Sequence, residues 1–367
     1  MLDAETVDRS WVRAGIAVAA VGWGANQFAP LLLMYQARLG LSAATVQATF
    51  GLYALGLMPA LLVGGLLADR YGRRTVLLPA LASSVLAGAL LIAGGNVPAL
   101  LFAGRLIAGI ASGSAFSSGA AWVKELAPAG TGARRLTVAM TTGFAVGPLV
   151  AGVLAQWAPL PTVLPYLPQL AIALIAIPLV LRTRETATGR RGSGLHLSAL
   201  RDPRFRRVIV PLAPWVFGSA SIALAYLPAL VSASLLFAAV TATLTALAGI
   251  AVQPLARRLD PLPLRRSALG IVVLGLLVSV AAVGRPALVV VAALVLGAGY
   301  GACQVCGLLE VQRIAGPAEL AGLTAIYQAI SYLGFAAPFL LTLLAPSVGL
   351  LIVAALAALT LLWTAKK

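Results

Sequence analysis

The chain has 367 residues, of which 61% are hydrophobic and only 10% charged, and its formal net charge is +16. A soluble domain carries about 25% charged residues, so this chain cannot cover a water-facing surface. The positive charge is grouped between apolar runs, which favours membrane topology over nucleic-acid binding. We therefore expect a polytopic protein with the lipid bilayer, and no nucleic acid, as its partner.

Apolar runs long enough to cross a bilayer recur along the whole chain. A membrane helix needs about 20 residues, whereas a barrel strand needs about 10. The runs therefore predict an all-α polytopic membrane protein with twelve transmembrane helices. The predicted spans are 14–35, 44–68, 75–95, 98–122, 136–157, 162–181, 208–231, 233–256, 267–284, 287–309, 321–345 and 348–364.

The basic residues are distributed unevenly between the gaps of this pattern. All but three of the 26 lysines and arginines lie near the termini or in every second gap, and the exceptions are Arg38, Arg105 and Arg285. The positive-inside rule then places both termini in the cytoplasm. The first apolar run is long enough to span and follows an acidic start, so we expect no cleavable signal peptide. The predicted location is the plasma (inner) membrane.

A polar, arginine-rich segment at 182–207 divides the predicted spans into two sets of six. We expect an N-terminal six-helix bundle at 1–181, a flexible cytoplasmic linker at 182–207 and a C-terminal six-helix bundle at 208–367. Few residues remain outside spans seven and eight, which predicts a tight hairpin between them.

The two halves look like diverged copies of one another. Gly109 and Gly113 recur as Gly297 and Gly301, in both cases 188 residues later. Paired six-helix repeats related by an axis along the membrane normal are one known transporter architecture.

Cysteine and histidine usage argues against a metal site and against an enzyme. Cys303 and Cys306 share one apolar run without a second ligand pair, so we interpret them as small packing residues. The sole histidine, His196, lies in the predicted linker. An integral-membrane enzyme would need convergent nucleophiles, acids or metal ligands. We therefore expect no enzymatic activity, metal or cofactor.

One short gap, residues 65–74, combines an acid, a glycine and an arginine pair. It reads Gly-Leu-Leu-Ala-Asp-Arg-Tyr-Gly-Arg-Arg. This resembles the loop between the second and third helices of major facilitator superfamily transporters, Gly-x-Leu-x-Asp-Arg-x-Gly-Arg-Arg. The resemblance implies the two-bundle fold of that superfamily and a set of residues that control its conformation. Those residues are Gly65, Asp69, Arg70, Gly72, Arg73, Arg74, Glu125, Glu310 and Arg313.

Partners for these charges follow partly from the resemblance. It places Asp69 near the start of span eleven, where a helix N-terminus would favour a carboxylate. A solvated loop acid is the alternative. Arg73 and Arg74 are expected either to pair with Glu125 or to hold anionic lipid headgroups.

Span four carries a second element of the resemblance. Arg105-Leu-Ile-Ala-Gly-Ile-Ala-Ser-Gly113 is similar to the superfamily's Arg-x3-Gly-x3-Gly element. An intramembrane arginine is costly, so Arg105 is a candidate for coupling or for substrate binding. The alternative is structural, in which Arg105 satisfies backbone carbonyls or Asn26 and Gln27 of span one.

Span five carries a third element. The stretch with Gly143, Gly147, Pro148 and Gly152 resembles the element associated with antiporter branches of the superfamily. Small residues four apart also let a neighbouring helix approach closely, so packing explains the stretch equally well.

Polar and aromatic side chains are concentrated in a few of the predicted spans. The resemblance implies that spans one, four, seven and ten line a central substrate path, and span eleven is similarly polar. The side chains expected to line the path are Trp23, Asn26, Gln27, Ser112, Trp215, Tyr226, Tyr300, Gln304, Tyr327 and Gln328.

Together these features predict a secondary active transporter that exports small amphipathic molecules as a monomer, by alternating access of the rocker-switch type. The antiporter resemblance implies proton coupling, whereas the lack of a mid-membrane acid argues against coupling and against cationic substrates. Neutral or weakly acidic amphipaths are therefore expected. An uptake permease or facilitator for a neutral or anionic solute is the alternative.

Overall fold

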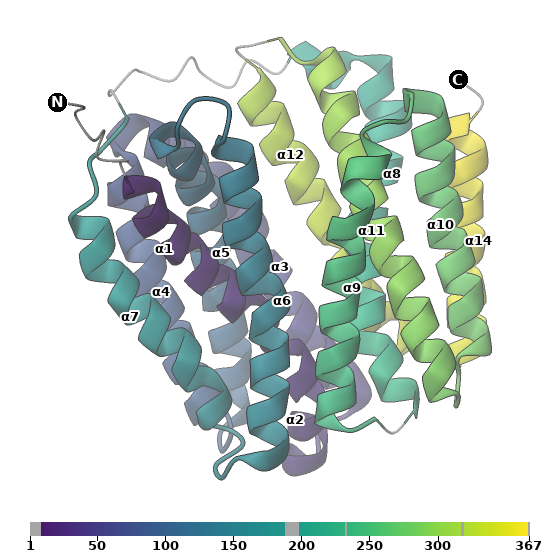
Figure 1. Ribbon diagram of the computed structural model, residues 1–367. Coiled ribbons are helices and arrows are strands. Elements are labelled where there is room, and N and C mark those ends of the chain that lie inside the picture. The colour runs from purple at the N-terminus through teal and green to yellow at the C-terminus, as the bar shows by residue number, and fades with distance from the viewer. Residues whose placement is uncertain (1–8, 188–197, 232, 317–318, 366–367) are drawn as a thin grey trace, which may run out of the picture.

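The computed structural model describes residues 9–187, 198–231, 233–316 and 319–365. Within these ranges every regular element is a helix, and twelve helical segments are long and apolar enough to cross a membrane. The predicted all-α fold with twelve spans is therefore confirmed. Figure 1 shows two groups of helices side by side, with the start of α1 and the end of α14 at the same end of the molecule.

The first group of helices, here named the first bundle, supplies six spans. It contains α1 (Ser10–Asn26), η1 (Ala29–Leu31), α2 (Leu32–Leu39), α3 (Ala43–Tyr71), α4 (Arg73–Ala93), α5 (Pro98–Leu126), α6 (Gly132–Trp157), η2 (Leu164–Tyr166) and α7 (Leu167–Leu181). The second bundle contains η3 (Ser198–Arg201), η4 (Phe205–Ile209), α8 (Val210–Ser221), η5 (Ile222–Tyr226), η6 (Leu227–Val231), α9 (Leu235–Ala256), α10 (Pro261–Ala281), α11 (Pro286–Ile314), α12 (Leu320–Tyr332), η7 (Leu333–Ala336), α13 (Ala337–Leu341) and α14 (Pro346–Ala365).

Two predicted boundaries were wrong by five residues or more, and the others lie within four residues of the observed bounds. The ninth span begins at Pro261 rather than 267, because Asp260 and Pro261 start a helix ahead of the apolar run. The tenth span ends at Ile314 rather than 309, because α11 continues past Glu310 into its polar end. The tight hairpin is confirmed, since span seven ends at Val231 and α9 begins at Leu235.

The internal repeat is also present in the positions where the helices begin and end. Both bounds of α5 and α11 differ by 188 residues, and so do both bounds of α4 and α10. A Cβ atom at Gly109 would overlap the carbonyl oxygen of Tyr53 in α3, and one at Gly297 would overlap that of Thr245 in α9. The repeated glycines therefore allow the same close helix approach in each bundle.

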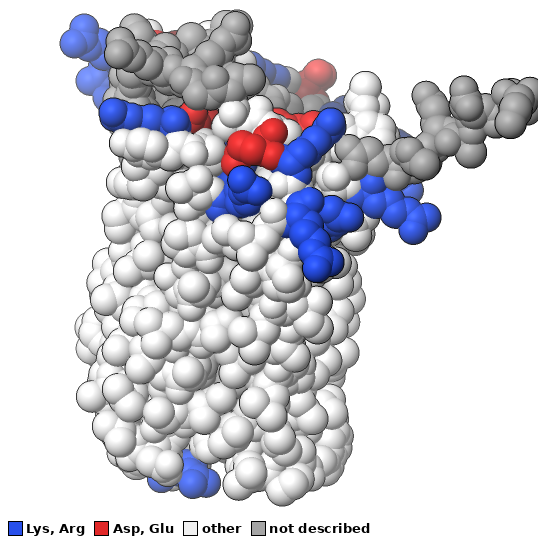
Figure 2. Space-filling model, turned by 90° about the vertical axis from the view of Figure 1, so that its left-hand side faces the viewer, with Lys and Arg blue, Asp and Glu red and all other residues white. Residues whose placement is uncertain are grey.

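Charged side chains gather at one end of the molecule. Every acid that the structure describes lies at this charged end, from Asp69 at the end of α3 to Glu319 beside α12. Arg38 and Arg285 are the basic residues at the opposite end, at the end of α2 and just before α11. Figure 2 shows the same polarity, with an uncharged belt between the ends. Such a belt suits the hydrocarbon core of a bilayer.

Candidate functional site

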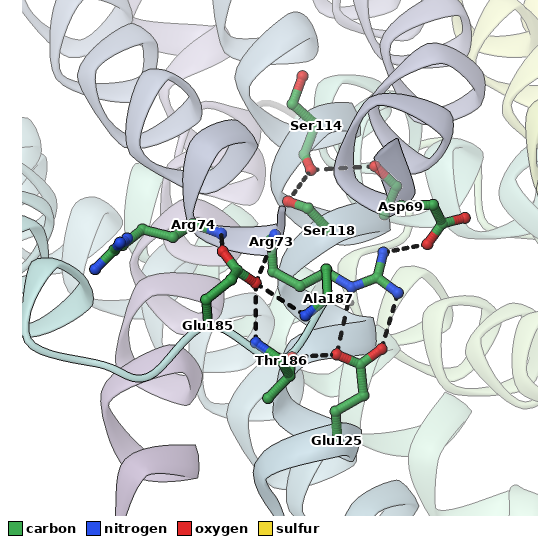
Figure 3. Close-up of polar contacts among 10 residues, drawn as sticks. Asp69, Arg73, Arg74, Ser114, Ser118, Glu125, Glu185, Thr186 and Ala187 are labelled. Carbon is green, nitrogen blue, oxygen red and sulfur yellow. Dashed lines mark hydrogen bonds and ion pairs between the residues drawn. The ribbon is translucent and has the colours of Figure 1, made fainter. Parts of the chain in front are cut away.

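Arg73 is the centre of an ion-pair cluster at the charged end (Figure 3). Its Nη1 lies 2.5 Å from Asp69 Oδ1, and its Nη2 lies 2.8 Å from Glu125 Oε1. The two acids come from the ends of α3 and α5, while Arg73 begins α4. Gly72 permits the reversal between α3 and α4, because its φ of +108° is strained for other residues. The predicted pairing of Arg73 with Glu125 is present.

Glu185, which lies just after α7, completes this cluster. Its carboxylate accepts hydrogen bonds from the backbone N–H groups of Arg73 and Arg74, both at 2.9 Å. The carboxylate thus supplies the negative cap for the N-terminus of α4. Desolvation by burial acts to raise the pKa of Glu185, but the backbone hydrogen bonds from Arg74, Arg73, Ala187 and Thr186 lower it overall.

The chain around Glu185 is fastened to the first bundle. Thr186 donates its hydroxyl to Glu125 at 2.5 Å, and Trp122 Nε1 donates to the carbonyl of Arg184 at 3.1 Å. The first residues of the predicted linker therefore form part of the charge cluster, and not a free connection. His196 lies outside the described residues.

Glu185 was not among the residues predicted from the sequence. The available signal was that Glu185 is the only acid between Glu125 and Asp202, within an otherwise basic segment. Nothing in that segment points to a partner 112 residues away.

Asp69 pairs within its own bundle. Among the described residues, its carboxylate contacts Arg73, and no hydrogen bond joins it to the start of α12. The expected docking of Asp69 near span eleven stays a prediction for another conformation. Arg70 lies with its guanidinium carbon 5.1 Å from the centre of the Tyr71 ring.

The remaining predicted control residues lie apart from Arg73. Glu310 and Arg313 form a separate pair at 3.4 Å near the end of α11. Gly65 lies one turn before Asp69, and a Cβ atom there would lie 3.7 Å from the Ser117 Cβ atom. The structure thus brings together Asp69, Gly72, Arg73, Arg74 and Glu125, but not the pair on α11.

Arg105 is fully buried inside the first bundle. Its guanidinium carbon lies 4.7 Å and 4.6 Å from the ring centres of Phe28 and Tyr53. It donates to the carbonyl oxygens of Ala25 and Phe50 at 3.3 and 3.2 Å. The neighbours of Arg105 are therefore aromatic faces and helix carbonyls, which recover part of its desolvation cost.

Aromatic rings join the two bundles. Phe335 of η7 lies 5.1 Å from Phe50 and 5.8 Å from Tyr53, both on α3. On the other side of Phe335, Phe217 of α8 stacks on Tyr332 at 4.1 Å. We name these five residues the aromatic cluster. The contact between the bundles at this cluster was not predicted from the sequence. Aromatic residues are common in apolar helices, and the residues that meet here are far apart in the chain.

Further contacts between the bundles lie from mid-molecule to the opposite end. Gln47, near the start of α3, donates to the carbonyl of Ala225 at 2.9 Å. The backbone N–H of Leu235 donates to Gln156 Oε1 at 3.0 Å.

The glycine element of α6 contacts both bundles. Cβ atoms at Gly143 and Gly147 would crowd the backbone of α1, near Ala19 and Trp23. A Cβ atom at Gly152 would overlap the Cβ atom of Ala239 in α9. Near Pro148, the carbonyl of Ala145 accepts a hydrogen bond from Thr243 at 3.1 Å. The element thus combines packing within the first bundle with contact across the bundles.

Several predicted path residues lie inside a bundle. Gln27 and Ser112 line a small void within the first bundle. Trp215 donates to Thr360 of α14 at 3.1 Å, and Tyr327 donates to the carbonyl of Cys303 at 3.3 Å.

Other predicted path residues keep unsatisfied polar atoms or flank the aromatic cluster. Trp23 Nε1, Gln304 Oε1 and Gln328 Oε1 are buried and have no hydrogen-bond partner within the described part of the chain. Tyr300 lies 5.7 Å from Phe217, and Tyr226 is buried in the second bundle. Asn26 is the last residue of α1 and is half-buried.

Potential metal ligands are scattered. Among the described residues no group of three or more His, Cys, Asp or Glu side chains could hold a metal ion. Cys303 and Cys306 are buried free thiols within α11.

Comparisons with known proteins agree with this geometry. Residues 14–338 match the family model of the Major Facilitator Superfamily. A D-xylose–proton symporter superposes with a TM-score of 0.74 at 17% identity, covering 96% of each chain. The inward-open xylose transporter XylE from E. coli gives 0.75 at 17% identity, covering 96% of this chain and 94% of its own. The nucleoside transporter NupG gives 0.73 at 12% identity, covering 96% and 98%.

One curated relative matches over a shorter stretch. The bacillibactin exporter of Bacillus subtilis (strain 168) is 27% identical over 143 residues. The match spans 36% of this chain and 36% of the exporter, so the two share about a third of their lengths. The family match covers most of the twelve spans, and on that ground this chain belongs to the Major Facilitator Superfamily.

Proposed function

We propose that this chain is a secondary active transporter that exports small amphipathic molecules by alternating access. The contact of Phe335 with Phe50 and Tyr53 carries the proposal, because it joins the bundles away from the charged end. Rocking about the middle of the molecule would break this contact and bring the charged ends of the bundles together. Two packed arrangements related in this way are what alternating access requires.

The ion-pair cluster supports a role in this change. Arg73, Asp69, Glu125 and Glu185 all belong to the first bundle or to the chain directly after it. The cluster therefore ties the ends of α3, α4 and α5 to one another within the first bundle. The second carboxylate oxygen of Asp69 remains available for a contact with α12 when the charged ends approach. The Asp69 side chain is 46% exposed, which leaves it accessible for that contact.

Export is proposed from two observations. The glycine element of α6 resembles that of antiporter branches and lies between α1 and α9. The bacillibactin exporter shares sequence with part of this chain. Uptake of a neutral or anionic solute is the second candidate, favoured by the fold likeness to sugar and nucleoside transporters.

Substrate charge follows from the buried groups. Every described acid lies at the charged end, and Arg105 is the fixed charge buried deep in the first bundle. A cation at mid-membrane would lack a counter-charge, and an unpaired buried charge is costly. We therefore propose neutral or weakly acidic amphipaths as substrates.

The bundles, linker and orientation belong to the same proposal. The bundles span 1–181 and 208–367, joined through 182–207, and a monomer sits in the inner membrane with its charged end in the cytoplasm. Single cysteines at Arg38 and Arg285 should react with an impermeant reagent added outside cells, whereas one at Arg134 should not. External labelling of Arg134→Cys would refute this orientation.

Transport into inverted membrane vesicles tests the function. The measurement compares amphipathic probes that are neutral, anionic or permanently cationic, with and without a proton gradient. Accumulation of neutral or anionic probes in inverted vesicles supports export, and its loss on dissipating the gradient supports proton coupling. Accumulation only in right-side-out vesicles would favour the uptake permease. Preference for the cationic probe would contradict the proposed substrate charge.

A further inference from the structure

A crevice at the opposite end of the molecule lies between the two bundles. Its volume is about 520 Å³, and its walls come from α2, the end of α6 and the start of α9. These three segments lie together at the lower end of Figure 1. The crevice is spanned by the hydrogen bond from the Leu235 backbone to Gln156.

The chemistry of the crevice is amphipathic and positive. Leu33, Met34 and Leu235 give it apolar walls, while Arg38 and Gln156 supply the polar groups. Arg38 is exposed, and within the described ranges it forms no ion pair, since the described acids lie at the charged end. The crevice therefore offers one uncompensated positive charge beside an apolar surface.

The position of the crevice points to a membrane lipid. Trp157, next to Gln156, is 66% exposed, and Leu160 on the following turn is 63% exposed. Exposed tryptophan is typical of the membrane–water interface, where lipid phosphates lie. Trp157 would thus set the crevice at headgroup depth, with Arg38 facing the phosphate and the apolar walls facing the first part of the acyl chains.

We propose that this crevice binds an anionic phospholipid whose phosphate pairs with Arg38. A headgroup with net negative charge is favoured over a zwitterionic one, because no acid of the described chain lies nearby to meet a choline or ethanolamine cation. The lipid contacts both bundles only while they meet at this end. Bound lipid therefore favours the conformation seen here, since a ligand shifts the population toward the state it binds better.

Native mass spectrometry of the full chain released from nanodiscs tests the proposal. The nanodiscs contain phosphatidylcholine with or without phosphatidylglycerol, and the measured quantity is the phosphatidylglycerol retained per protein. A basic residue near an anionic surface contributes about 1 kcal/mol, so Arg38→Gln should weaken retention about fivefold. Arg38→Lys should retain most of it. Arg285→Gln is the matched control, because Arg285 lies at the same end and donates to the carbonyl of Ala281, away from the crevice.

Each outcome bears on the proposal. Selective loss in Arg38→Gln, with Arg285→Gln unchanged, supports it. Equal loss in both variants would assign the effect to general surface charge, and no loss in either would leave the crevice without lipid selectivity; both results overturn the proposal. A free amphipath is tested with octyl phosphate in detergent. Arg38-dependent binding of octyl phosphate without selective retention of phosphatidylglycerol would overturn the assignment to a lipid.

Discussion

Replacing Phe335 by leucine tests the contact that holds the bundles together at the opposite end. Leucine keeps an apolar side chain in a buried position but removes the ring. Across the bundles Phe335 forms two ring pairs, with Phe50 at 5.1 Å and Tyr53 at 5.8 Å. Its pairs with Phe217 and Tyr332 lie within the second bundle, so they persist when the bundles separate.

The size of the effect follows from the two pairs that cross between the bundles. A ring pair is worth about 0.5–1.5 kcal/mol beyond its buried area, so two pairs contribute about 1–3 kcal/mol. Loss of that energy shifts the equilibrium between the states closed and open at the opposite end by a factor of about 5 to 150. The variant should therefore open at this end and still insert and fold normally.

Distance measurement between spin labels checks this prediction. The labels are placed at Trp157→Cys and Ala287→Cys, which are exposed at the opposite end on different bundles, after Cys303 and Cys306 are replaced by alanine. Phe335→Leu should add a population with a longer distance.

A matched control separates the bundle contact from general ring packing. Phe144→Leu also removes one ring of a pair, the one that Phe116 forms at 5.5 Å within the first bundle. Equal distance distributions in the two variants would refute the reasoning, because a bundle contact must respond differently from a pair inside one bundle.

Three further predictions concern the charged groups. Glu185→Gln should lower the melting temperature at neutral pH, since loss of a helix cap costs about 0.5–2 kcal/mol. The pKa of Glu185 is lowered in the folded chain, so its stabilisation is present above the ordinary glutamate pKa and lost as pH falls through the folded value. The melting temperature of Glu185→Gln should therefore fall less than that of wild type between pH 7 and acidic pH, and equal pH slopes would contradict this assignment. Asp69→Asn should lower transport several-fold at normal membrane amounts, because a carboxylate at a helix N-terminus contributes about 0.3–2 kcal/mol to one conformation. Unchanged transport would leave Asp69 only its ion pair with Arg73 and no role in the conformational change. Arg105→Ala should abolish transport and Arg105→Lys should nearly do so, because lysine lacks the planar fork that serves two carbonyls at once, and normal vesicle transport by Arg105→Ala would remove it from the mechanism.

The fold could be predicted largely from composition and charge placement. Apolar run length identifies each span because an isolated membrane helix must satisfy its own backbone and match the bilayer. The two wrong bounds, at Pro261 and Ile314, lie where helices continue beyond the apolar core into polar sequence. There hydropathy carries no information, and only local helix signals such as Asp260-Pro261 remain.

The candidate site could be predicted only where its residues are close in sequence. Asp69, Gly72 and Arg73 form one short motif, and they also lie together in the structure. Glu185 reaches Arg73 across 112 residues, and Phe335 reaches Phe50 across the two bundles. Which distant residues meet depends on how the helices pack. The spacing of residues along a single sequence does not show that packing.

Arg105 contacts two members of the aromatic cluster, Phe50 and Tyr53. These contacts suggest how a buried cation could matter for transport without an acidic partner. Tyr53 and Phe50 place their ring centres 4.6 and 5.6 Å from the Arg105 guanidinium carbon. The same two rings meet Phe335 across the bundles. Any motion that withdraws Phe335 also uncovers the rings that shield Arg105 from water. Because the cost of a buried charge depends strongly on its access to water, we expect the energy of Arg105 to differ between this conformation and one in which Phe335 is withdrawn. The fixed charge and the bundle contact are therefore linked through Phe50 and Tyr53.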